Sequence, residues 1–313
     1  MPPRMKAFVT GGAGFIGSNL VDALVERGDA VEVLDDLSTG RALNLDSAVA
    51  RGAVLHAGDV RDAERVAALV AAAAPDVLFH LAAQIDVRRA VADPAFDAEI
   101  NVAGTINVLE AARRADVPRL VNSSTGGAIY GDTPSIPTAE DTRPAPLAPY
   151  GQSKHAAEGY CGLYGRLHGL STVSLRYANV YGPRQDPHGE GGVVAIFCGK
   201  LIEGGHPMAF GDGRQTRDYV YVGDIVAANL AAAGSDWVGA CNIGTGTETT
   251  VIELAAALRD LDGSRPFELE HAPERPGEVH RSAVDPSLAR EALGWEARVA
   301  LPEGLRRTLA SVR

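Results

Sequence analysis

The sequence has few cysteines and no pattern typical of a metal site. Its three cysteines, Cys161, Cys198 and Cys241, are far apart and form no C-x-x-C motif. An odd and scattered set argues against a disulfide framework or a structural zinc site, so we expect reduced, buried thiols. The eight histidines show no H-E-x-x-H spacing or similar motif, and no metal is predicted.

Basic residues are also scarce relative to acidic ones. The 313 residues include 29 Lys and Arg against 40 Asp and Glu, a net charge of −11. A nucleic-acid surface needs a basic footprint, so that class is excluded. An anionic ligand would need local arginines or helix N-termini to hold it. Long apolar runs and an apolar N-terminal signal stretch are absent as well, so we expect a cytoplasmic protein without a membrane span.

Short apolar runs alternate with helical patterns in the first half of the sequence. Strands are expected over 7–10, 31–34, 53–56, 77–81, 120–123 and 172–175, and helices over 15–27, 62–73, 97–115 and 150–168. This alternation predicts an α/β fold with a doubly wound parallel Rossmann sheet, covered by helices on both faces. Five prolines between Pro134 and Pro149 predict a long surface loop.

The pattern becomes irregular after about Tyr181. Helices are expected over 194–203, 222–233, 251–261 and 286–293, among frequent glycines and prolines. We predict a first, dinucleotide-binding domain over residues 1–181, joined by a later segment near 211–236. Residues 182–313 are expected to form a smaller C-terminal α/β region that binds the substrate.

A glycine-rich turn follows the first expected strand. Gly11, Gly14 and Gly17 form G-x-x-G-x-x-G, and the next helix begins in this turn. Glycines at such positions permit the tight turn, the approach of backbone to a pyrophosphate, and close packing of helix on strand. The helix N-terminus favours a bound phosphate. The turn therefore predicts a dinucleotide site.

Acidic residues at the ends of the next two strands refine this prediction. Asp35 and Asp36 end the second strand, and Asp35 lies 18 residues after Gly17. A carboxylate there accepts hydrogen bonds from ribose hydroxyls and repels a 2′-phosphate, so NAD is predicted rather than NADP. Asp59 and Val60 follow the third strand and are expected to face the adenine.

Tyr150 and Lys154 are candidate catalytic residues. They are four residues apart on an expected helix, so they share one face. A lysine ammonium near a phenol favours the phenolate and so lowers the pKa of the tyrosine. Such a tyrosine can take a proton from a sugar hydroxyl while hydride leaves the same carbon.

A hydroxyl-rich segment precedes this pair at the end of the fifth expected strand. Thr125 lies 25 residues before Tyr150, and we expect its hydroxyl to relay the proton between the sugar and Tyr150. Ser124 is the alternative for the same role.

These motifs resemble the extended short-chain dehydrogenase/reductase family, and within it the UDP-glucose (UDP-galactose) 4-epimerases. The resemblance runs from Met5 to Arg307 and rests on residues 10–17, 80–83, 101–105, 150–154, 175–184, 217–219 and 242–246. Residues 84–88, 185–190 and 192–197 resemble a bacterial subgroup of the 4-epimerases.

The resemblance implies NAD and a UDP-sugar as ligands, and a homodimer formed through the helices near 101–115 and 150–168. The cofactor contacts that it adds are Phe15, Ile16, Leu81, Ala82, Ala83, Gln84, Asn101 and Tyr177, besides Tyr150 and Lys154. The implied substrate contacts are Val87, Thr125, Gly126, Asn179, Val193, Val194, Phe210, Arg217, Arg275, Glu278 and Ser282. Among these, Asn179, Arg217 and Arg275 would meet the diphosphate. Val193, Val194 and the 208–210 strand would flank the uracil.

Two positions depart from the family pattern. Counted from Tyr130, Gly126 stands where many epimerases have the catalytic Ser or Thr, so the choice between Thr125 and Ser124 stays open. Glu278 stands where an aspartate usually takes a ribose hydroxyl.

The predicted reaction is NAD-dependent 4-epimerisation of a UDP-hexose through a transient 4-keto sugar. UDP-glucose and UDP-galactose are the expected pair, and a small Ser282 in the sugar pocket would also admit UDP-GlcNAc and UDP-GalNAc. A UDP-glucuronate 4-epimerase is the alternative. A 4,6-dehydratase or a uronate decarboxylase would need an acidic residue where the chain has Gly126 and Gly127. A non-catalytic NAD-binding regulator would not need Tyr150 and Lys154.

Overall fold

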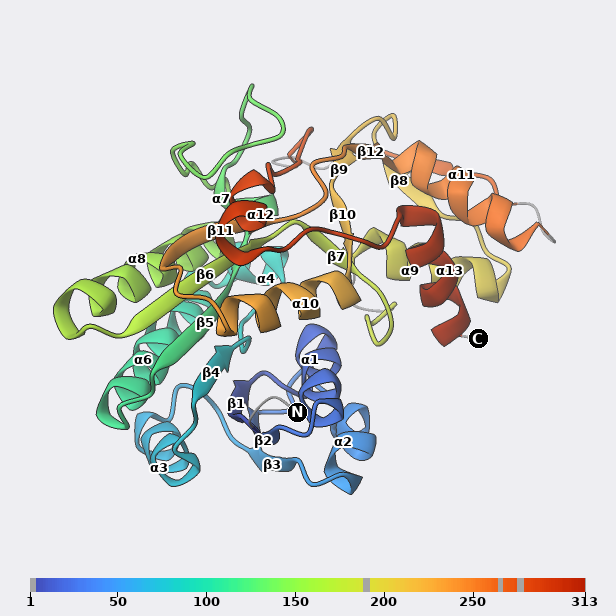
Figure 1. Ribbon diagram of the computed structural model, residues 1–313. Helices are drawn as coiled ribbons and strands as arrows, with labels where there is room; N and C mark the ends of the chain where they lie inside the picture. The colour runs from blue at the N-terminus through green and yellow to red at the C-terminus, as the bar shows by residue number, and fades with distance from the viewer. Residues whose placement is uncertain (1–3, 188–191, 264–266, 275–278, 313) are drawn as a thin grey trace.

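The computed structural model describes residues 4–187, 192–263, 267–274 and 279–312 (Figure 1). The elements of the first half are β1 (Lys6–Thr10), α1 (Phe15–Glu26), β2 (Ala30–Asp35), a 3-10 helix (Ala42–Leu45), α2 (Asp46–Ala50), β3 (Val54–Ala57), α3 (Ala63–Ala73), β4 (Val77–His80), α4 (Val87–Ala92), α5 (Pro94–Ala98), a π-helix (Glu99–Ala103), α6 (Gly104–Arg114), β5 (Arg119–Thr125), α7 (Gly126–Ile129), α8 (Pro149–His168) and β6 (Ser171–Tyr177). Those of the second half are β7 (Asn179–Tyr181), α9 (Val193–Glu203), β8 (Met208–Phe210), β9 (Thr216–Arg217), β10 (Tyr219–Tyr221), α10 (Val222–Ala233), β11 (Gly239–Ile243), β12 (Thr249–Thr250), α11 (Val251–Asp262), β13 (Glu270–Ala272), α12 (Ser287–Leu293) and α13 (Leu301–Val312).

Seven parallel strands form the main sheet in the order β3-β2-β1-β4-β5-β6-β11. The chain builds one half of the sheet outward from β1 and then returns to build the other half from β4. The α/β doubly wound parallel sheet predicted from the sequence is confirmed. In such a sheet ligands bind beyond the carboxyl ends of the strands where the order reverses, which here is between β1 and β4.

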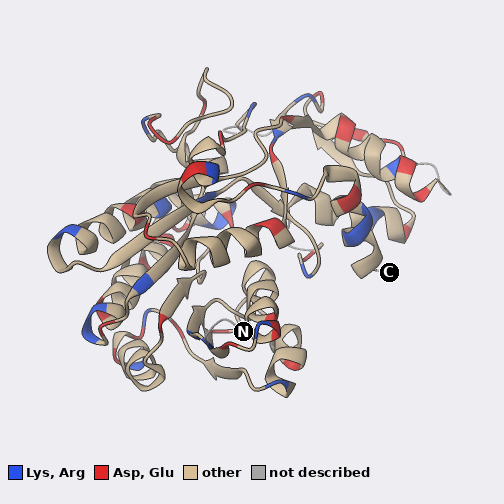
Figure 2. Cartoon of the chain, viewed as in Figure 1, with Lys and Arg blue, Asp and Glu red and all other residues tan. Residues whose placement is uncertain are grey.

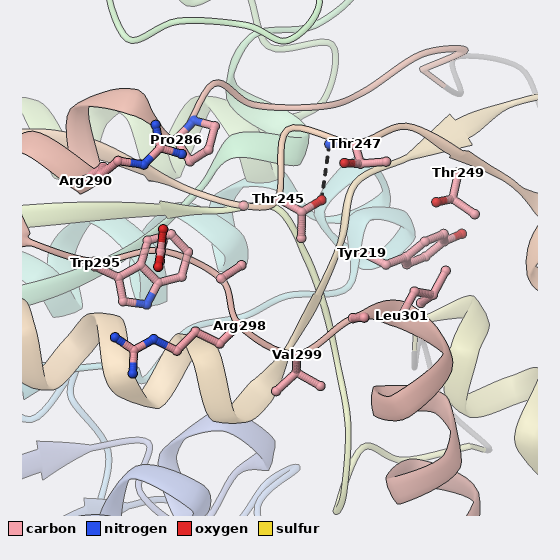
Figure 3. A pocket seen from close by; sticks show the side chains of 14 residues that line it. Tyr219, Thr245, Thr247, Thr249, Pro286, Arg290, Trp295, Arg298, Val299 and Leu301 are labelled. Atoms are coloured by element: carbon pink, nitrogen blue, oxygen red, sulfur yellow. Dashed lines mark hydrogen bonds between the residues drawn. The ribbon is translucent and has the colours of Figure 1, made fainter.

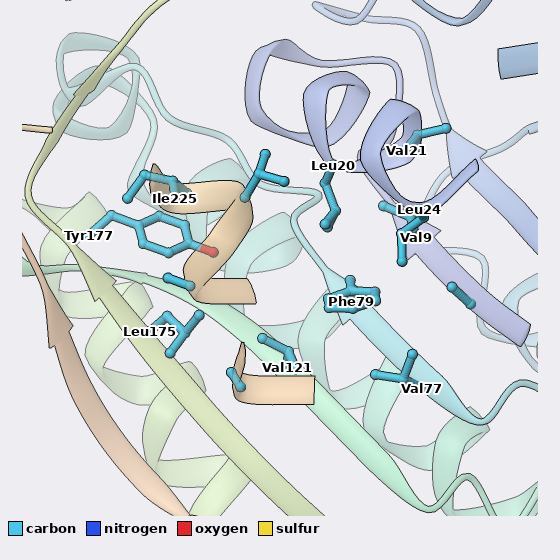
Figure 4. Close-up of a cluster of buried hydrophobic side chains, with 14 of the residues drawn as sticks. Val9, Leu20, Val21, Leu24, Val77, Phe79, Val121, Leu175, Tyr177 and Ile225 are labelled. Atoms are coloured by element: carbon cyan, nitrogen blue, oxygen red, sulfur yellow. The ribbon is translucent and has the colours of Figure 1, made fainter. Parts of the chain in front are cut away.

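The two faces of the sheet bury separate hydrophobic clusters. Ala7 and Val9 point to the face covered by α1 and α10, and Phe8 points to the face covered by α3, α6 and α8. Figure 4 shows the first cluster, in which Phe79 and Ile225 are fully buried. Burial on both faces is the reason why these strands read as nearly continuous apolar runs in the sequence.

The smaller region lies beside the carboxyl end of the sheet (Figure 1). It contains three two-stranded pairs, β7 with β10, β8 with β13 and β9 with β12. Helices α9, α11 and α13 pack around a third hydrophobic cluster that includes Phe197, Leu254 and Leu305.

Some elements lie outside the sequence-based expectations. Strand β11, Gly-Ala-Cys-Asn-Ile, joins the main sheet beside β6 although it follows the segment 211–236. Helix α13 was not expected either, although its leucines at 301, 305 and 309 recur every four residues, as they do on one face of a helix. The helix expected over 97–115 is a continuous run of α5, the π-helix and α6.

The charged residues, the cysteines and the apolar segments are arranged as follows. Acidic and basic residues are interspersed along the outer helices and loops (Figure 2), and several arginines pair with carboxylates, as Arg61 does with Asp59. The three cysteines are free and buried, and burial raises the pKa of each thiol to about 12. Among the described residues, no group of three or more potential metal ligands occurs, and no helix is both long and apolar enough to cross a membrane.

Arg119 ties the end of α10 to the sheet. Its guanidinium is buried at the start of β5 and donates to the carbonyl oxygen of Ala232 at 2.8 and 3.1 Å and to that of Trp237 at 2.7 Å. A cation at the carboxyl end of a helix satisfies carbonyl groups that have no partner within the helix and complements the helix dipole.

We predict that Arg119→Ala lowers the free energy of unfolding by about 3 kcal/mol, because it leaves these buried carbonyl groups without a donor. The matched control is Arg114→Ala, which removes an exposed arginine paired with Glu110 and should cost less than about 1 kcal/mol. Urea unfolding of both variants measures the difference. Equal losses would contradict the anchoring function of Arg119.

Candidate active site

The ends of β1 and β4 diverge where the strand order reverses, and the glycine turn lies in this crevice. Gly11 has a φ of +70°, and a Cβ at this position would lie 2.6 Å from the backbone nitrogen of Ala82. The backbone after β1 therefore touches the backbone after β4. Only glycine permits both the left-handed conformation and this approach.

The next two glycines of the turn differ in what surrounds them. A Cβ at Gly17 would lie 2.1 Å from the carbonyl oxygen of Gly11, so helix α1 packs directly on the turn. Gly14 is the N-cap of α1 and has no side-chain cap, and a Cβ there would meet only the Gly11 oxygen, at 3.3 Å. The free N–H groups of α1 thus lie beside an uncrowded glycine, an arrangement that fits a dinucleotide pyrophosphate.

Asp35 lies at the end of β2 beside this turn. Its buried carboxylate accepts hydrogen bonds from the backbone N–H groups of Ala13 at 2.8 Å and Leu37 at 2.9 Å. Burial raises the pKa of Asp35, although both bonds oppose this shift. Each carboxylate oxygen keeps acceptor capacity for a ribose hydroxyl. Asp36 is exposed and accepts from Ser38 at 3.0 and 2.7 Å, so it orders the following loop.

Asp59 and Val60 follow β3. The Asp59 carboxylate accepts from the Arg61 guanidinium at 2.6 and 2.9 Å, and this contact lowers the pKa of Asp59. Val60 is buried against Gly104, and its carbonyl accepts from Asn107 at 3.0 Å. In the ligand-free chain, Asp59 is therefore engaged by Arg61.

Gln84 and Asn101 fasten the loop after β4 to the π-helix. The Gln84 N–H donates to Asn101 Oδ1, and Asn101 Nδ2 donates to the Gln84 carbonyl, each at 2.9 Å. The loop that also carries Leu81, Ala82 and Ala83 is thereby held in one conformation. A π-helical turn inside an α-helix is often found at a functional site.

His80 was not expected to act in the site, yet it connects the two halves of the crevice. Its Nδ1 lies 2.7 Å from the Thr10 hydroxyl, and its Nε2 lies 2.9 Å from the Thr105 hydroxyl, which donates to the Asn101 carbonyl. Burial lowers the pKa of His80 to about 3, so the ring is neutral at neutral pH. The motif 80–83 was visible in the sequence, but the hydroxyl partners come from β1 and α6.

Thr125, Tyr150 and Lys154 lie together at the carboxyl end of β5. Tyr150 is in the first turn of α8, whose first residue is Pro149, and Lys154 is one turn further and buried. The Thr125 hydroxyl accepts from the Ala128 N–H at 3.2 Å and lies close enough to the Tyr150 phenol to lower the pKa of that phenol. Three residues from two elements thus form one cluster.

The electrostatics of the cluster differ from the sequence-based expectation. Burial raises the pKa of Tyr150 to about 12, helped by the charge of Asp97 and opposed by the hydrogen bond from Thr125. Burial lowers the pKa of Lys154 to about 8. The phenol therefore keeps its proton at neutral pH. Desolvation outweighs the lowering expected from Lys154, because both groups are enclosed by protein.

Ser124 points to a different partner. Its hydroxyl donates to Glu158 Oε1 at 2.5 Å, and Glu158 forms a buried ion pair with Arg176 at 2.7 Å. Arg176 in turn donates to the Tyr130 hydroxyl at 2.8 Å. Ser124 is therefore part of a buried polar network behind the cluster, while Thr125 contacts Tyr150.

The space beyond Thr125 is lined by α7, β7 and the chain around Val284. A Cβ at Gly126 would lie 2.6 Å from Val284 Cγ1, whereas one at Gly127 would meet only Asn179 Oδ1, at 3.5 Å. Asn179 Oδ1 is buried and accepts no hydrogen bond from the described residues. An orphaned amide oxygen here fits a site that a polar ligand completes.

The remaining expected contacts differ in their burial. Val87, Val193, Phe210, Arg217 and Ser282 are exposed or partly exposed, whereas Val194 and Tyr177 are buried. Tyr177 lies in the core of Figure 4, and its hydroxyl donates to Asn229 at 3.0 Å. Arg275 and Glu278 lie outside the described residues.

A separate hollow of about 360 Å³ lies between the loop after β11 and the segment that joins α12 to α13. In Figure 3, Thr245, Thr247 and Thr249 line one side, and Arg290 and Trp295 the other. None of the residues expected to bind cofactor or substrate lines it, so it is not part of the candidate active site.

Comparison with known proteins agrees with this geometry. The model of the NAD dependent epimerase/dehydratase family matches residues 7–244. The chain is 48% identical to a UDP-glucose 4-epimerase of Mycolicibacterium smegmatis over 99% of both proteins. Among solved structures, it resembles the Thermotoga maritima UDP-glucose 4-epimerase with UDP-glucose (TM-score 0.95, 44% identity, 98% of each chain). It also resembles the Thermus thermophilus UDP-glucose 4-epimerase in complex with NAD (TM-score 0.91, 43% identity, 98% of each chain).

Two glycine substitutions should separate ligand binding from folding of the turn. Gly14→Ala adds a methyl group on the side left for the pyrophosphate, so NAD should bind about 10- to 100-fold more weakly while stability changes little. Gly17→Ala should lower the free energy of unfolding by about 1–3 kcal/mol as well, because its Cβ overlaps the Gly11 oxygen.

The matched control for both variants is Gly159→Ala in α8, where a Cβ meets nothing within 4 Å. Calorimetric titration with NAD and thermal unfolding of the three variants test the prediction. Unchanged NAD affinity in Gly14→Ala would contradict the placement of the pyrophosphate.

Proposed function

Because the chain belongs to the NAD dependent epimerase/dehydratase family, we propose that it interconverts UDP-glucose and UDP-galactose by NAD-dependent epimerisation at C4 of the hexose. The chain is similar over its full length to UDP-glucose 4-epimerases, and nearly all of both chains is covered. This similarity supports the proposal.

The observation that carries the proposal is the cluster of Thr125, Tyr150 and Lys154. It lies at the carboxyl end of β5, next to the crevice formed by the glycine turn, and the Thr125 hydroxyl is near enough to Tyr150 to lower the pKa of the phenol. A hydroxyl group, a phenol and an ammonium are the groups needed to remove a proton from a sugar alcohol. Gly11, Gly14, Gly17 and Asp35 would hold NAD, with Gln84 and Asn101 fixing the neighbouring loop.

The hydrogen-bond pattern gives the proton a direction. Thr125 accepts from the Ala128 N–H and donates toward Tyr150, so one acceptor position of its hydroxyl stays available for the 4-hydroxyl of the sugar. A proton can then pass from the sugar to Thr125 and on to the Tyr150 oxygen. The Lys154 ammonium, together with the positive charge of NAD when bound, would stabilise the phenolate that accepts the proton, because burial alone keeps Tyr150 protonated at neutral pH. Bound NAD supplies the acceptor, and later the donor, of the hydride at C4.

Inversion requires the 4-keto sugar to present its other face before the hydride returns. The nucleotide must stay bound meanwhile. We assign Asn179 and Arg217 to the diphosphate, and Val193 and Phe210 to the base. In support, Asn179 Oδ1 is buried without a hydrogen-bond partner among the described residues, and the other three side chains are partly exposed.

Gly126 argues against the dehydratase and decarboxylase reactions of related enzymes. A dehydratase or decarboxylase would need an acidic side chain after the strand-end hydroxyl, but Val284 and the Arg176 carbonyl fill the space that a Cβ would take, at 2.6 and 3.1 Å. Gly127 has room but offers no side chain. These glycines also leave only backbone N–H groups for a uronate carboxylate.

We predict that Tyr150→Phe lowers kcat for UDP-galactose by about 10²- to 10⁴-fold, because it removes the group that accepts the proton. NAD affinity should stay within a few-fold of the parent. Chromatography of the nucleotide sugars, started from UDP-galactose, UDP-GalNAc or UDP-glucuronate in turn, gives both the rate and the preferred sugar.

Tyr160→Phe is the matched control, since it removes an exposed phenol hydroxyl from the same helix and should keep the parent rate. A parent protein that converts neither UDP-galactose nor UDP-GalNAc, or a Tyr150→Phe variant with the parent rate, would overturn the proposed function.

We also infer a homodimer in which α8 contacts its counterpart in a second chain; the cytoplasmic location stays a prediction. Tyr160, Leu163 and Leu167 form an apolar stripe along α8 and are 36%, 40% and 64% exposed. Residues three and four positions apart lie on one helix face, so the stripe is continuous and available for packing.

The double variant Leu163→Glu/Leu167→Glu should convert this dimer to a monomer, because two charges would be buried in the interface. Light scattering after size-exclusion chromatography should give twice 32.6 kDa for the parent and 32.6 kDa for the variant. Leu43→Glu, at an exposed site away from α8, should keep the parent mass. A monomeric parent would contradict the inference.

A further inference from the structure

A fully buried carboxylate, Asp97, lies behind the catalytic cluster. It is on α5, the short helix before the π-helix, and none of its surface is exposed. Its Oδ1 accepts from Gln84 Nε2 at 2.8 Å and from Asn101 Nδ2 at 3.1 Å. Its Oδ2 is equally buried and accepts no hydrogen bond from the described residues. Both of its donors are therefore neutral amides.

The buried charge acts on both catalytic groups across α5 and α8. The negative charge of Asp97 raises the pKa of Lys154, opposing the effect of burial, and it raises the pKa of Tyr150 as well. An ionised carboxylate with one unsatisfied oxygen is costly inside a protein unless a nearby cation offsets it. Lys154 is the cation that this field reaches.

Other charged groups around the cluster are already compensated or exposed. Cys161 and Glu158, on the same helix, raise the pKa of Lys154 more than Asp97 does, but Glu158 is also paired with Arg176 at 2.7 Å. Cys161 keeps its proton, and His80 is neutral at neutral pH.

The acidic residues close to Asp97 in the sequence make contacts away from the catalytic cluster. Asp93 caps α5 through the Phe96 N–H, Asp86 caps α4 through the Arg89 N–H, and Glu99 is exposed beside Arg61. Asp97 is thus the charge that bears on the cluster from the α5 side.

We propose that Asp97 is a positioning residue of this site: its carboxylate anchors Gln84 and Asn101 and supplies the counter-charge that keeps Lys154 protonated beside Tyr150. The inference rests on the proposed function, since it assigns a task within the same cluster. It concerns the protonation of the cluster rather than contact with the substrate.

Asp97→Asn tests the charge and leaves the packing nearly unchanged. The amide oxygen can accept the bonds from Gln84 and Asn101, and the NH₂ group takes the place of the unsatisfied Oδ2. Loss of the negative charge favours the neutral amine of Lys154 and the phenolate of Tyr150. Both groups should then lose their protons at lower pH, so both limbs of the kcat–pH profile should move to lower pH by about one unit.

Two further variants complete the design. Asp97→Glu keeps the charge and alters the geometry, so kcat should fall while both limbs keep the parent positions. Glu99→Gln, the matched control, removes a charge two residues away on the exposed side and should leave the profile unchanged. The KM for UDP-galactose should stay within about twofold in Asp97→Asn, because no substrate contact is lost.

The outcomes separate this inference from the proposed function. An inactive parent protein refutes the function itself. An active parent with an Asp97→Asn variant whose limbs keep the parent positions refutes the charge role of Asp97. Should Asp97→Asn fail to fold, Asp97→Glu decides: a profile with the limbs of the parent supports the proposal, and displaced limbs overturn it.

Discussion

The reactive end of the molecule depends on how closely two stretches of backbone approach each other where the strand order reverses. Gly11 touches the backbone of Ala82, and Gly17 touches Gly11. No side chain fits between them, so the N-terminus of α1 and the loop after β4 are fixed relative to each other. That loop then reaches the π-helix through Gln84 and Asn101. A steric constraint at Gly11 and Gly17 thereby sets the position of groups on the far side of the crevice.

The catalytic cluster adds an electrostatic constraint. Burial acts against the charged forms of both Tyr150 and Lys154, which favours a phenol and an amine rather than a phenolate and an ammonium. Only three of the 29 basic residues in the chain are lysines. An arginine at position 154 could not titrate near neutral pH and would present a planar, extended cation instead of a compact one. The choice of lysine here follows from its adjustable protonation.

Much of this arrangement could be predicted from the sequence because it is encoded locally. The glycine turn, Asp35 at a strand end, and the one-turn spacing of Tyr150 and Lys154 each depend on neighbours within a few residues. His80 and Asp97 were not predicted to contribute. The hydroxyl partners of His80 lie on β1 and α6, and the catalytic groups that the charge of Asp97 affects lie on α8, and the local sequence shows neither relation. Strand β11 was not predicted for a similar reason: its five residues form a strand by pairing with β6, not by their own pattern.

The choice between Thr125 and Ser124 could not be made from the neighbouring sequence alone. Both are hydroxyl residues at the end of β5, and successive side chains of a strand point to opposite faces. The strand therefore sends one toward Tyr150 and the other toward Glu158, and only the packing of α8 decides which is which.

The sugar end of the site is shaped by a contact between distant parts of the chain. Buried Asp218 accepts from the N–H groups of Thr245 at 2.9 Å and Gly246 at 3.1 Å, and from that of Val284 at 3.4 Å. This carboxylate holds Val284 against Gly126, so the wall beside Thr125 is an isopropyl group rather than an acid. In the proposed mechanism a proton leaves the sugar hydroxyl next to Thr125, but this wall offers no acid or base for a second carbon. The packing itself therefore favours reversible oxidation at one carbon over elimination.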